Sequence, residues 1–183
     1  MKILQNNKNW DKENYEIMEI SKIDDKIIKK LIDNLKLDLS DDFFISFESL
    51  LKLGKRAESA IESQIKDMDE VHNFKKEIFN FLHKNIKTNE IENPLITRLY
   101  HPDFIIRANA IMHIDKNDAL KYLNLILPLI SDPDDSVRWA VIKLLGTLNQ
   151  LDNPIISKKL IKQLSFESNP VIKKTIKKIL KKS

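Results

Sequence analysis

Apolar residues recur along the chain at the spacing of amphipathic helices. Near the C-terminus, Ile172, Ile176, Ile179 and Leu180 fall at i, i+4, i+7 and i+8, which places them on one stripe of a helix. A similar stripe runs through residues 27–35. The same pattern predicts helices over residues 23–37, 41–53, 55–66, 71–86, 93–100, 103–114, 118–130, 135–149, 153–165 and 168–182.

The amino-acid composition favours helices over strands. Only 2 of the 183 residues are Gly, Val and Thr are scarce, and Leu, Ile, Lys, Glu and Asn dominate. Pro128 falls in the last turn of the helix expected over residues 118–130, where it should bend or end that helix. The expected fold class is therefore all-α.

The chain repeats itself with a period near 31 residues. The segment HPDFIIRANAI aligns with DPDDSVRWAVI, which begins 31 residues later, and pairs Asp103 with Asp134 and Arg107 with Arg138. A third copy begins at ESNPVIKKTIKKIL, and a worn copy lies upstream at SDDFFISFESLLKLG. Two helical segments per period predict a helical solenoid.

The run LPLISDPDDSVRWAVIKLLGTL, residues 127–148, resembles the HEAT-repeat pattern. In that pattern a helix end is followed by a D-P-D-x-x-V-R turn, a small residue and a Leu-Gly close. The resemblance extends over residues 41–183 and implies an α-α superhelix, a right-handed solenoid of antiparallel helix pairs. We expect one HEAT-like domain over residues 23–183, closed by a basic capping helix over 168–182, and an N-terminal extension over 1–22.

The acidic cluster in this run has a chemical and a structural interpretation. Asp132, Asp134 and Asp135 offer hard oxygen ligands for a divalent cation, or a carboxylate pair for acid and base chemistry. The repeat favours structure, because every residue aligned with Asp134 is of a type that caps helices. These aligned residues are Asp42, Asp103 and Asn169. We therefore expect neither a metal nor a catalytic residue here.

The resemblance also implies a ladder of side-chain bonds between neighbouring repeats. It assigns Asp132 and Arg138 to this ladder, with Arg107 at the matching position of the preceding copy. The position of Asp132 is occupied by His101 in the preceding copy, and in the last copy Glu167 and Lys173 replace both members of the ladder. These replacements predict an interrupted ladder, although the helices should still stack.

Glycine and proline mark the same period. Gly54 and Gly146 are 92 residues apart, and each follows a Leu where a helix is expected to end. Asn-Pro pairs at residues 93–94 and 153–154 place a capping Asn before a Pro at the first helical position. All four positions therefore have structural roles in the prediction.

The sequence lacks the motifs of several enzyme classes. The absence of Cys excludes disulfides, thiolate zinc sites and Cys nucleophiles. None of the four His is followed by Glu, as in the His-Glu pairs of HEAT-type metal hydroxylases, and none forms an H-x-x-x-H pair. Neither a nucleophile elbow nor a Gly-rich phosphate loop is present. We predict a non-catalytic protein without cofactor or metal.

The helix register suggests where a partner binds. It turns Trp139 and Lys143 toward the side that the resemblance assigns to the concave surface. An exposed Trp beside Met and Lys is typical of an interface anchor, although Trp139 can equally fill space between helices. We predict that this scaffold binds a protein or peptide. The Lys side chains would favour an acidic partner. The predicted binding residues are Trp139, Met112, Ile142, Lys143, Lys174 and Lys178.

Positive charge is concentrated at the C-terminus. The net charge is +4, but residues 154–183 hold nine Lys against one acid. The last helix can therefore bind nucleic-acid phosphates, or serve only as a solvated cap. It has no aromatic residue and no Arg, so it offers neither base stacking nor bidentate base recognition. Nucleic-acid binding is the second hypothesis, and a DNA glycosylase built from HEAT-like repeats is a distant third.

The N-terminal segment MKILQNNKNWDKENYE has no apolar stretch of signal-peptide length. No later run approaches the length of apolar sequence that spans a bilayer. Together with the absence of Cys, these observations favour a soluble cytoplasmic protein that does not act at a membrane.

Overall fold

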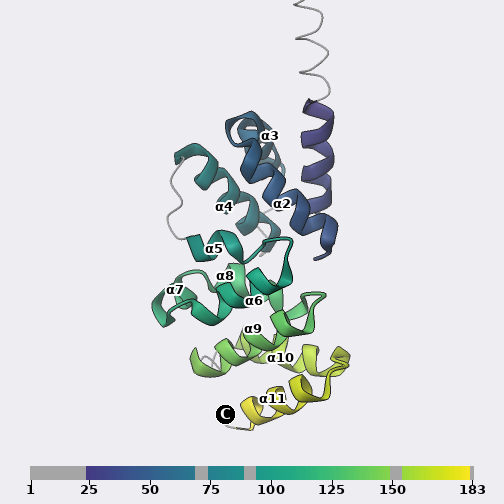
Figure 1. Ribbon diagram of the computed structural model, residues 1–183, viewed down its shortest axis with the longest axis vertical. Coiled ribbons are helices and arrows are strands. Elements are labelled where there is room, and N and C mark those ends of the chain that lie inside the picture. The colour runs from purple at the N-terminus through teal and green to yellow at the C-terminus, as the bar shows by residue number, and fades with distance from the viewer. Residues whose placement is uncertain (1–23, 69–73, 89–93, 149–153, 182–183) are drawn as a thin grey trace, which may run out of the picture.

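The computed structural model describes residues 24–68, 74–88, 94–148 and 154–181, and every regular element in these ranges is helical. The helices stack along the long axis of the molecule (Figure 1). Residues 24–35 form the helix at one end, and α11 (Pro170–Leu180) lies at the other. The all-α prediction is confirmed, and no described helix is long and apolar enough to cross a bilayer. The extension predicted over residues 1–22 lies outside the described ranges.

Most helix bounds agree with the pattern of apolar positions, and those predicted for α2 and α3 match in full. After the helix over residues 24–35, the elements before α11 are α2 (Asp41–Leu53), α3 (Lys55–Lys66), α4 (Phe74–Thr88), α5 (Pro94–Arg98), α6 (Phe104–His113), α7 (Lys116–Lys121), α8 (Leu123–Ile126), the 3-10 helix η1 (Leu127–Ser131), α9 (Asp135–Leu148) and α10 (Pro154–Phe166).

The segment expected as one helix over residues 118–130 is broken. It consists of α7, α8 and η1, with a first break at Tyr122, whose φ of −105° and ψ of 22° leave the helical region. Pro128 lies in η1 and has no amide hydrogen with which to continue the α-helical hydrogen bonds of α8. The effect expected of Pro128 is confirmed, but the prediction of a single helix is wrong.

From α5 onward the helices form two layers. In one layer α6 packs against α9, and α9 packs against α11. In the other layer η1, which continues α8, packs against α10. Contacts of η1 with α9 and of α10 with α11 join the layers, which is the arrangement of a helical solenoid.

The N-terminal helices pack less regularly. A strict solenoid joins only neighbouring repeats, whereas α4 contacts α2, α3 and also α8. Tyr100 fixes this junction, because its buried ring lies 5.1 Å from the ring centre of Phe47 and also contacts Phe43 and Phe44. Burial raises the pKa of the Tyr100 hydroxyl, which donates to the carbonyl oxygen of Leu125 at 2.6 Å. One neutral side chain therefore links α2 to α8.

The predicted caps are present in the regular repeats. The side chains of Asp103, Asp134 and Asn169 accept the amide hydrogen of the residue two positions later, at 2.8, 2.9 and 2.9 Å. The prediction fails at Asp42, which lies in the first turn of α2 while Ser40 caps that helix. Pro94 and Pro154 begin their helices, and the Asn residues before them lie outside the described ranges.

The two glycines differ in their roles. Gly54 ends α2 with a φ of 55° and a ψ of −131°, a conformation that side-chain-bearing residues rarely adopt. Gly146 lies inside α9, so the prediction that it ends a helix is wrong. A Cβ atom at Gly146 would lie 2.9 Å from Cδ1 of Ile179, which shows that this glycine lets α11 approach α9 closely.

Candidate functional site

Arg107 of α6 is the first of two arginines that link consecutive pairs of helices. Its Nε and Nη2 donate to the carboxylate of Asp132 at 2.9 and 2.8 Å. Its Nη1 donates to the carbonyl oxygens of His101 and Pro102 at 2.9 and 2.8 Å. The side chain is only 2% exposed and lies over the ring of Phe44 in α2, 3.8 Å from its centre. Each guanidinium nitrogen thus has an acceptor.

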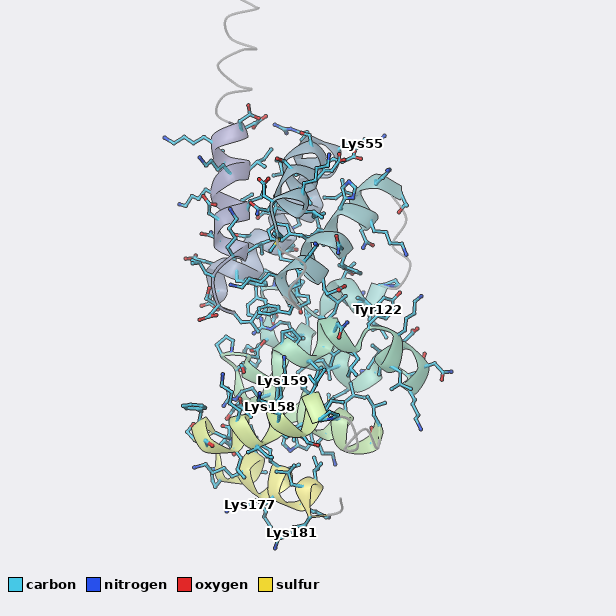
Figure 2. The ribbon with its side chains drawn as sticks, turned by 180° about the vertical axis from the view of Figure 1, so that it is seen from behind. Lys55, Tyr122, Lys158, Lys159, Lys177 and Lys181 are labelled. Atoms are coloured by element: carbon cyan, nitrogen blue, oxygen red, sulfur yellow. The ribbon has the colours of Figure 1, made fainter. Side chains whose placement is uncertain are left out.

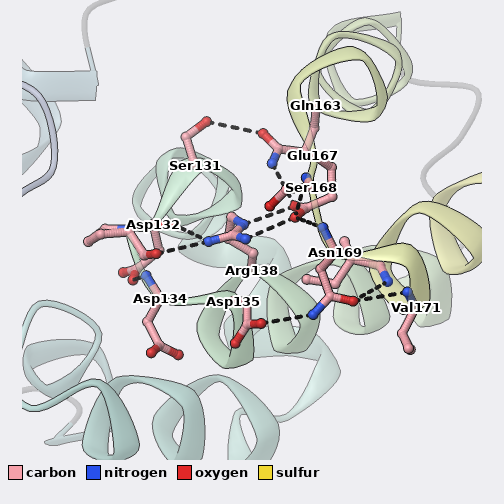
Figure 3. Close-up of polar contacts among 12 residues, drawn as sticks. Ser131, Asp132, Asp134, Asp135, Arg138, Gln163, Glu167, Ser168, Asn169 and Val171 are labelled. Carbon is pink, nitrogen blue, oxygen red and sulfur yellow. Dashed lines mark hydrogen bonds and ion pairs between the residues drawn. The ribbon is translucent and has the colours of Figure 1, made fainter.

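Arg138 of α9 repeats this geometry one unit later (Figure 3). Its Nε and Nη2 each donate to the carboxylate of Glu167 at 2.9 Å. Its Nη1 donates to the carbonyl oxygens of Asp132 and Pro133, both at 3.0 Å. Gln163 also donates to Glu167 at 2.9 Å. The two arginines therefore form equivalent bidentate pairs with the acid of the next unit.

The acid that opens each turn also orders the turn backbone. Asp132 Oδ1 accepts the amide hydrogen of Asp134 at 2.9 Å, and Glu167 Oε1 accepts that of Asn169 at 3.0 Å. Each carboxylate therefore binds the preceding unit and the turn of its own unit.

His101 takes the same position in the first of these units. Its Nδ1 accepts the amide hydrogen of Asp103 at 2.9 Å, as the carboxylates do in the later turns. An accepting Nδ1 leaves the hydrogen of a neutral imidazole on Nε2, which lies 3.9 Å from Oε1 of Glu48 in α2. The turn therefore keeps its shape although the acid is missing.

Charge and burial act differently on the two carboxylates. Hydrogen bonds from Arg138 lower the pKa of Glu167 to about 2. Burial raises the pKa of Asp132, although Arg107 and the Asp134 amide oppose that shift. Both side chains are 0% exposed and hold their partners, so neither is free to act on a substrate.

The other acids of the cluster have structural partners too. Asp134 caps α9, and Asp135 accepts a hydrogen bond from the side chain of Asn169 at 2.8 Å (Figure 3). Within the described ranges no three His, Cys, Asp or Glu side chains are arranged to hold a metal ion. The cluster is therefore a joint between helices.

Five of the six predicted binding residues lie on one layer of helices. Trp139 of α9 is half-buried against the core, and Lys143, one turn later, places Nζ 5.4 Å from the centre of the indole. Met112 of α6 is 55% exposed, and Lys174 and Lys178 of α11 are exposed. Because α9 packs between α6 and α11, these five residues lie on three adjacent helices.

The prediction that the sixth residue, Ile142, lies on this surface is wrong. Its side chain is 0% exposed. The reason is that α9 is flanked by α6 and α11 and also contacts η1, which leaves only a narrow strip around Trp139 and Lys143 uncovered. Ala108, aligned with Trp139 in the repeat, is also buried.

The two-layered part of the structure, from α5 to α11, matches a known family. A family model described as HEAT repeats matches residues 92–181, which include α5 through α11. These residues belong to the HEAT-repeat family. HEAT repeats generally act as protein-interaction scaffolds and are typically non-catalytic. No curated protein and no solved structure matches the chain significantly.

The HEAT ladder is continuous at Glu167, where the sequence predicted an interruption. Glu167 forms the same bidentate pair with Arg138 that Asp132 forms with Arg107. Arg138 and Asp132 both belong to the ladder as predicted, but they meet only through the backbone carbonyl of Asp132. The sequence alignment did not indicate this pairing between successive units, because it compares equivalent positions rather than contacting ones.

The last HEAT unit carries the concentrated positive charge. Lys174, Lys177 and Lys178 of α11 are exposed, as is Lys181 directly after it, and Lys173 is half-buried. Viewed from behind, labelled lysines lie on both α10 and α11 at this end of the stack (Figure 2). The single acid of this unit, Glu167, is already neutralised by Arg138, so the lysine charge is not balanced within the unit.

A groove of about 620 Å³ was not predicted from the sequence. It lies where η1 and α10 meet the start of α4 and the segment that follows the helix over residues 24–35. The side chains that matter below are Asp38, Leu39, Phe74, Lys159, Lys162 and Phe166. A signal existed in α10, where Ile155, Lys159, Lys162 and Phe166 recur at helical spacing.

Proposed function

We propose that the chain is a non-catalytic HEAT-repeat scaffold of the cytoplasm that binds a protein or peptide partner. The binding surface is the Trp139 face, defined as Trp139, Met112, Lys143, Lys174 and Lys178. The single observation that carries the proposal is the half-buried Trp139 with Lys143 over its ring, between the exposed side chains of α6 and α11.

The shape and chemistry of the Trp139 face suit a protein surface. A Trp fixed against the core offers a large apolar area at little entropic cost, and Met112 adapts to irregular partners. The long Lys stems contribute further apolar area around the indole. Stacked helices extend this surface over three units, which suits an extended partner segment.

The charge of the face favours an acidic partner. Lys143, Lys174 and Lys178 are exposed, and no acid among the described residues forms an ion pair with any of them. Complementary charge raises the association rate and penalises basic competitors. Binding should therefore weaken as the salt concentration rises.

The hydrogen bonds of the acidic cluster support a non-catalytic role. A general base needs a free acceptor within reach of a substrate proton. Asp132 and Glu167 instead hold arginines and backbone amides, and Asp134 caps a helix.

Site-specific crosslinking tests the proposal. A photoreactive amino acid at Met112 should give a discrete protein adduct in cells that express the chain. The same group at Ile27, which is 49% exposed on the first described helix, is the matched control and should give none. Replacing Lys174 and Lys178 by Glu should remove the Met112 adduct without loss of folding, because both side chains are exposed.

An adduct pattern that is the same at Met112 and Ile27 would contradict the Trp139 face. Binding of single-stranded or duplex probes at low salt, lost in the Lys174→Glu, Lys178→Glu variant, would favour nucleic-acid binding instead. Release of a methylated base from DNA would point to the glycosylase hypothesis.

A further inference from the structure

The groove beside α10 combines an apolar wall with unpaired positive charge. Phe166 is 76% exposed at its rim, and Leu39, which precedes α2, and Phe74 of α4 line it from the other side. Phe166 therefore extends the apolar part of the wall, to which Leu39 and Phe74 belong, out to the solvent. The groove thus has the composition of a binding site rather than of a packing defect.

The acids in the groove wall do not balance its lysines. Of the three acids in the wall, Asp132 and Glu167 are committed to Arg107 and Arg138 in bidentate pairs, which leaves one carboxylate, that of Asp38, against the charges of two lysines. Among the described residues, Lys159 and Lys162 form no ion pair with any acid.

Lys159 is held in an unfavourable environment for a cation. Its side chain is half-buried, and burial together with the neighbouring charge of Lys162 lowers its pKa. An anion placed between the two amines would relieve both effects. The groove is therefore predisposed to take up negative charge.

We propose that this groove binds an acidic peptide segment of a partner protein, in which carboxylates flank one large apolar side chain. The carboxylates lie between Lys159 and Lys162, and the apolar side chain packs against Phe166, Phe74 and Leu39. None of the residues of the Trp139 face lines the groove, so this is a second site that does not depend on the first.

The lining favours a peptide over a nucleic acid. Nucleic-acid affinity comes from several phosphates that follow a track of cations. The groove has two lysines without an ion-pair partner rather than a track of cations, and the lysines of α11 do not line it. A short segment with two or three carboxylates around an apolar residue fits this arrangement better.

A random peptide library displayed on phage and selected on the full chain tests the proposal. Wild-type protein should enrich sequences that place Asp or Glu on both sides of Phe, Leu, Ile or Trp. The variant Lys159→Gln, Lys162→Gln should bind the enriched peptides about tenfold more weakly. Phe166→Ser should weaken them by a similar factor without loss of folding, because the Phe166 side chain is 76% exposed.

Matched controls separate the groove from general positive charge. Lys177→Gln, Lys181→Gln removes the same charge from α11, outside the groove, and should leave peptide affinity unchanged. The proposal is overturned if the enriched peptides lack acids, if they bind the Lys159→Gln, Lys162→Gln variant as well as wild type, or if an oligonucleotide binds the groove in their place. The proposal is also overturned if the variant Lys174→Glu, Lys178→Glu loses peptide binding while the groove variants keep it, because the peptides would then bind the Trp139 face.

Discussion

Replacing Asp132 by Asn should destabilise the protein by about 3–5 kcal/mol. The Asp132 side chain is 0% exposed and accepts hydrogen bonds from two nitrogens of Arg107 and from the amide of Asp134. An Asn side chain keeps one acceptor oxygen but turns an NH₂ group toward the guanidinium. The Arg107 charge, itself 2% exposed, is then buried without a counter-ion.

This loss is a large part of the free energy of unfolding expected for the whole protein. Natural domains are stable by about 5–15 kcal/mol, and breaking a buried ion pair from one side costs much more than an exposed pair contributes. For a chain of this size the loss corresponds to a fall in Tm of roughly 10 °C. The variant should still fold, because the helices keep their apolar core.

Urea unfolding followed by far-UV circular dichroism measures the effect, with an unchanged m value as the sign that the unfolding reaction is the same. Glu62→Gln is the matched control. It breaks the Lys66–Glu62 pair, whose side chains are 72% and 50% exposed, and should change the stability far less than Asp132→Asn does. A loss for Asp132→Asn no larger than that of the control would refute the reasoning, because the buried pair would then be worth no more than an exposed one.

Three further predictions concern Glu167, Gly146 and Gly54. The lowered pKa of Glu167 provides stability that should be lost progressively as the pH falls from 4.5 to about 2. The stability of Glu167→Gln should therefore depend less on pH in this range. At neutral pH the wild type should be more stable than this variant by about 3 kcal/mol, as measured by urea unfolding at each pH. Gly146→Ala should stabilise the Ile179→Ala variant by about 1 kcal/mol, because that variant lacks the atom that the added Cβ would meet. In the wild type the same substitution should stabilise the protein by less, and a double-mutant cycle measures the difference. Gly54→Ala should cost about 1–3 kcal/mol in thermal or urea unfolding although no atom lies within 4 Å of the added Cβ, because the backbone conformation itself is strained for Ala; an unchanged stability would contradict this.

The sequence predicted well those features that depend on neighbours along the chain. Helix positions follow from apolar spacing, and the caps at Asp103, Asp134 and Asn169 follow from residue types at helix starts. A cap acts over two or three residues, so its partner is already known from the sequence. The exception at Asp42 arose in the worn copy, where the alignment placed the helix start two residues late.

Features that depend on distant contacts were predicted less well. The role of Gly146 depends on Ile179, which lies on another helix, and the burial of Ile142 depends on how closely α6, α11 and η1 surround α9. The groove is formed by segments separated by more than 100 residues, so neither periodicity nor the repeat could place Phe74 near Lys159.

Arg107 has a consequence for how the molecule opens. This one side chain binds the carbonyl oxygens of its own turn, the carboxylate of Asp132 in the next unit and the ring of Phe44 in α2. Any local opening that separates α2 from α6, or α6 from η1, has to break contacts of the same guanidinium. The irregular N-terminal helices and the first HEAT units should therefore open together, and the slowest amides of α2 and α6 should exchange hydrogen for deuterium with the same free energy.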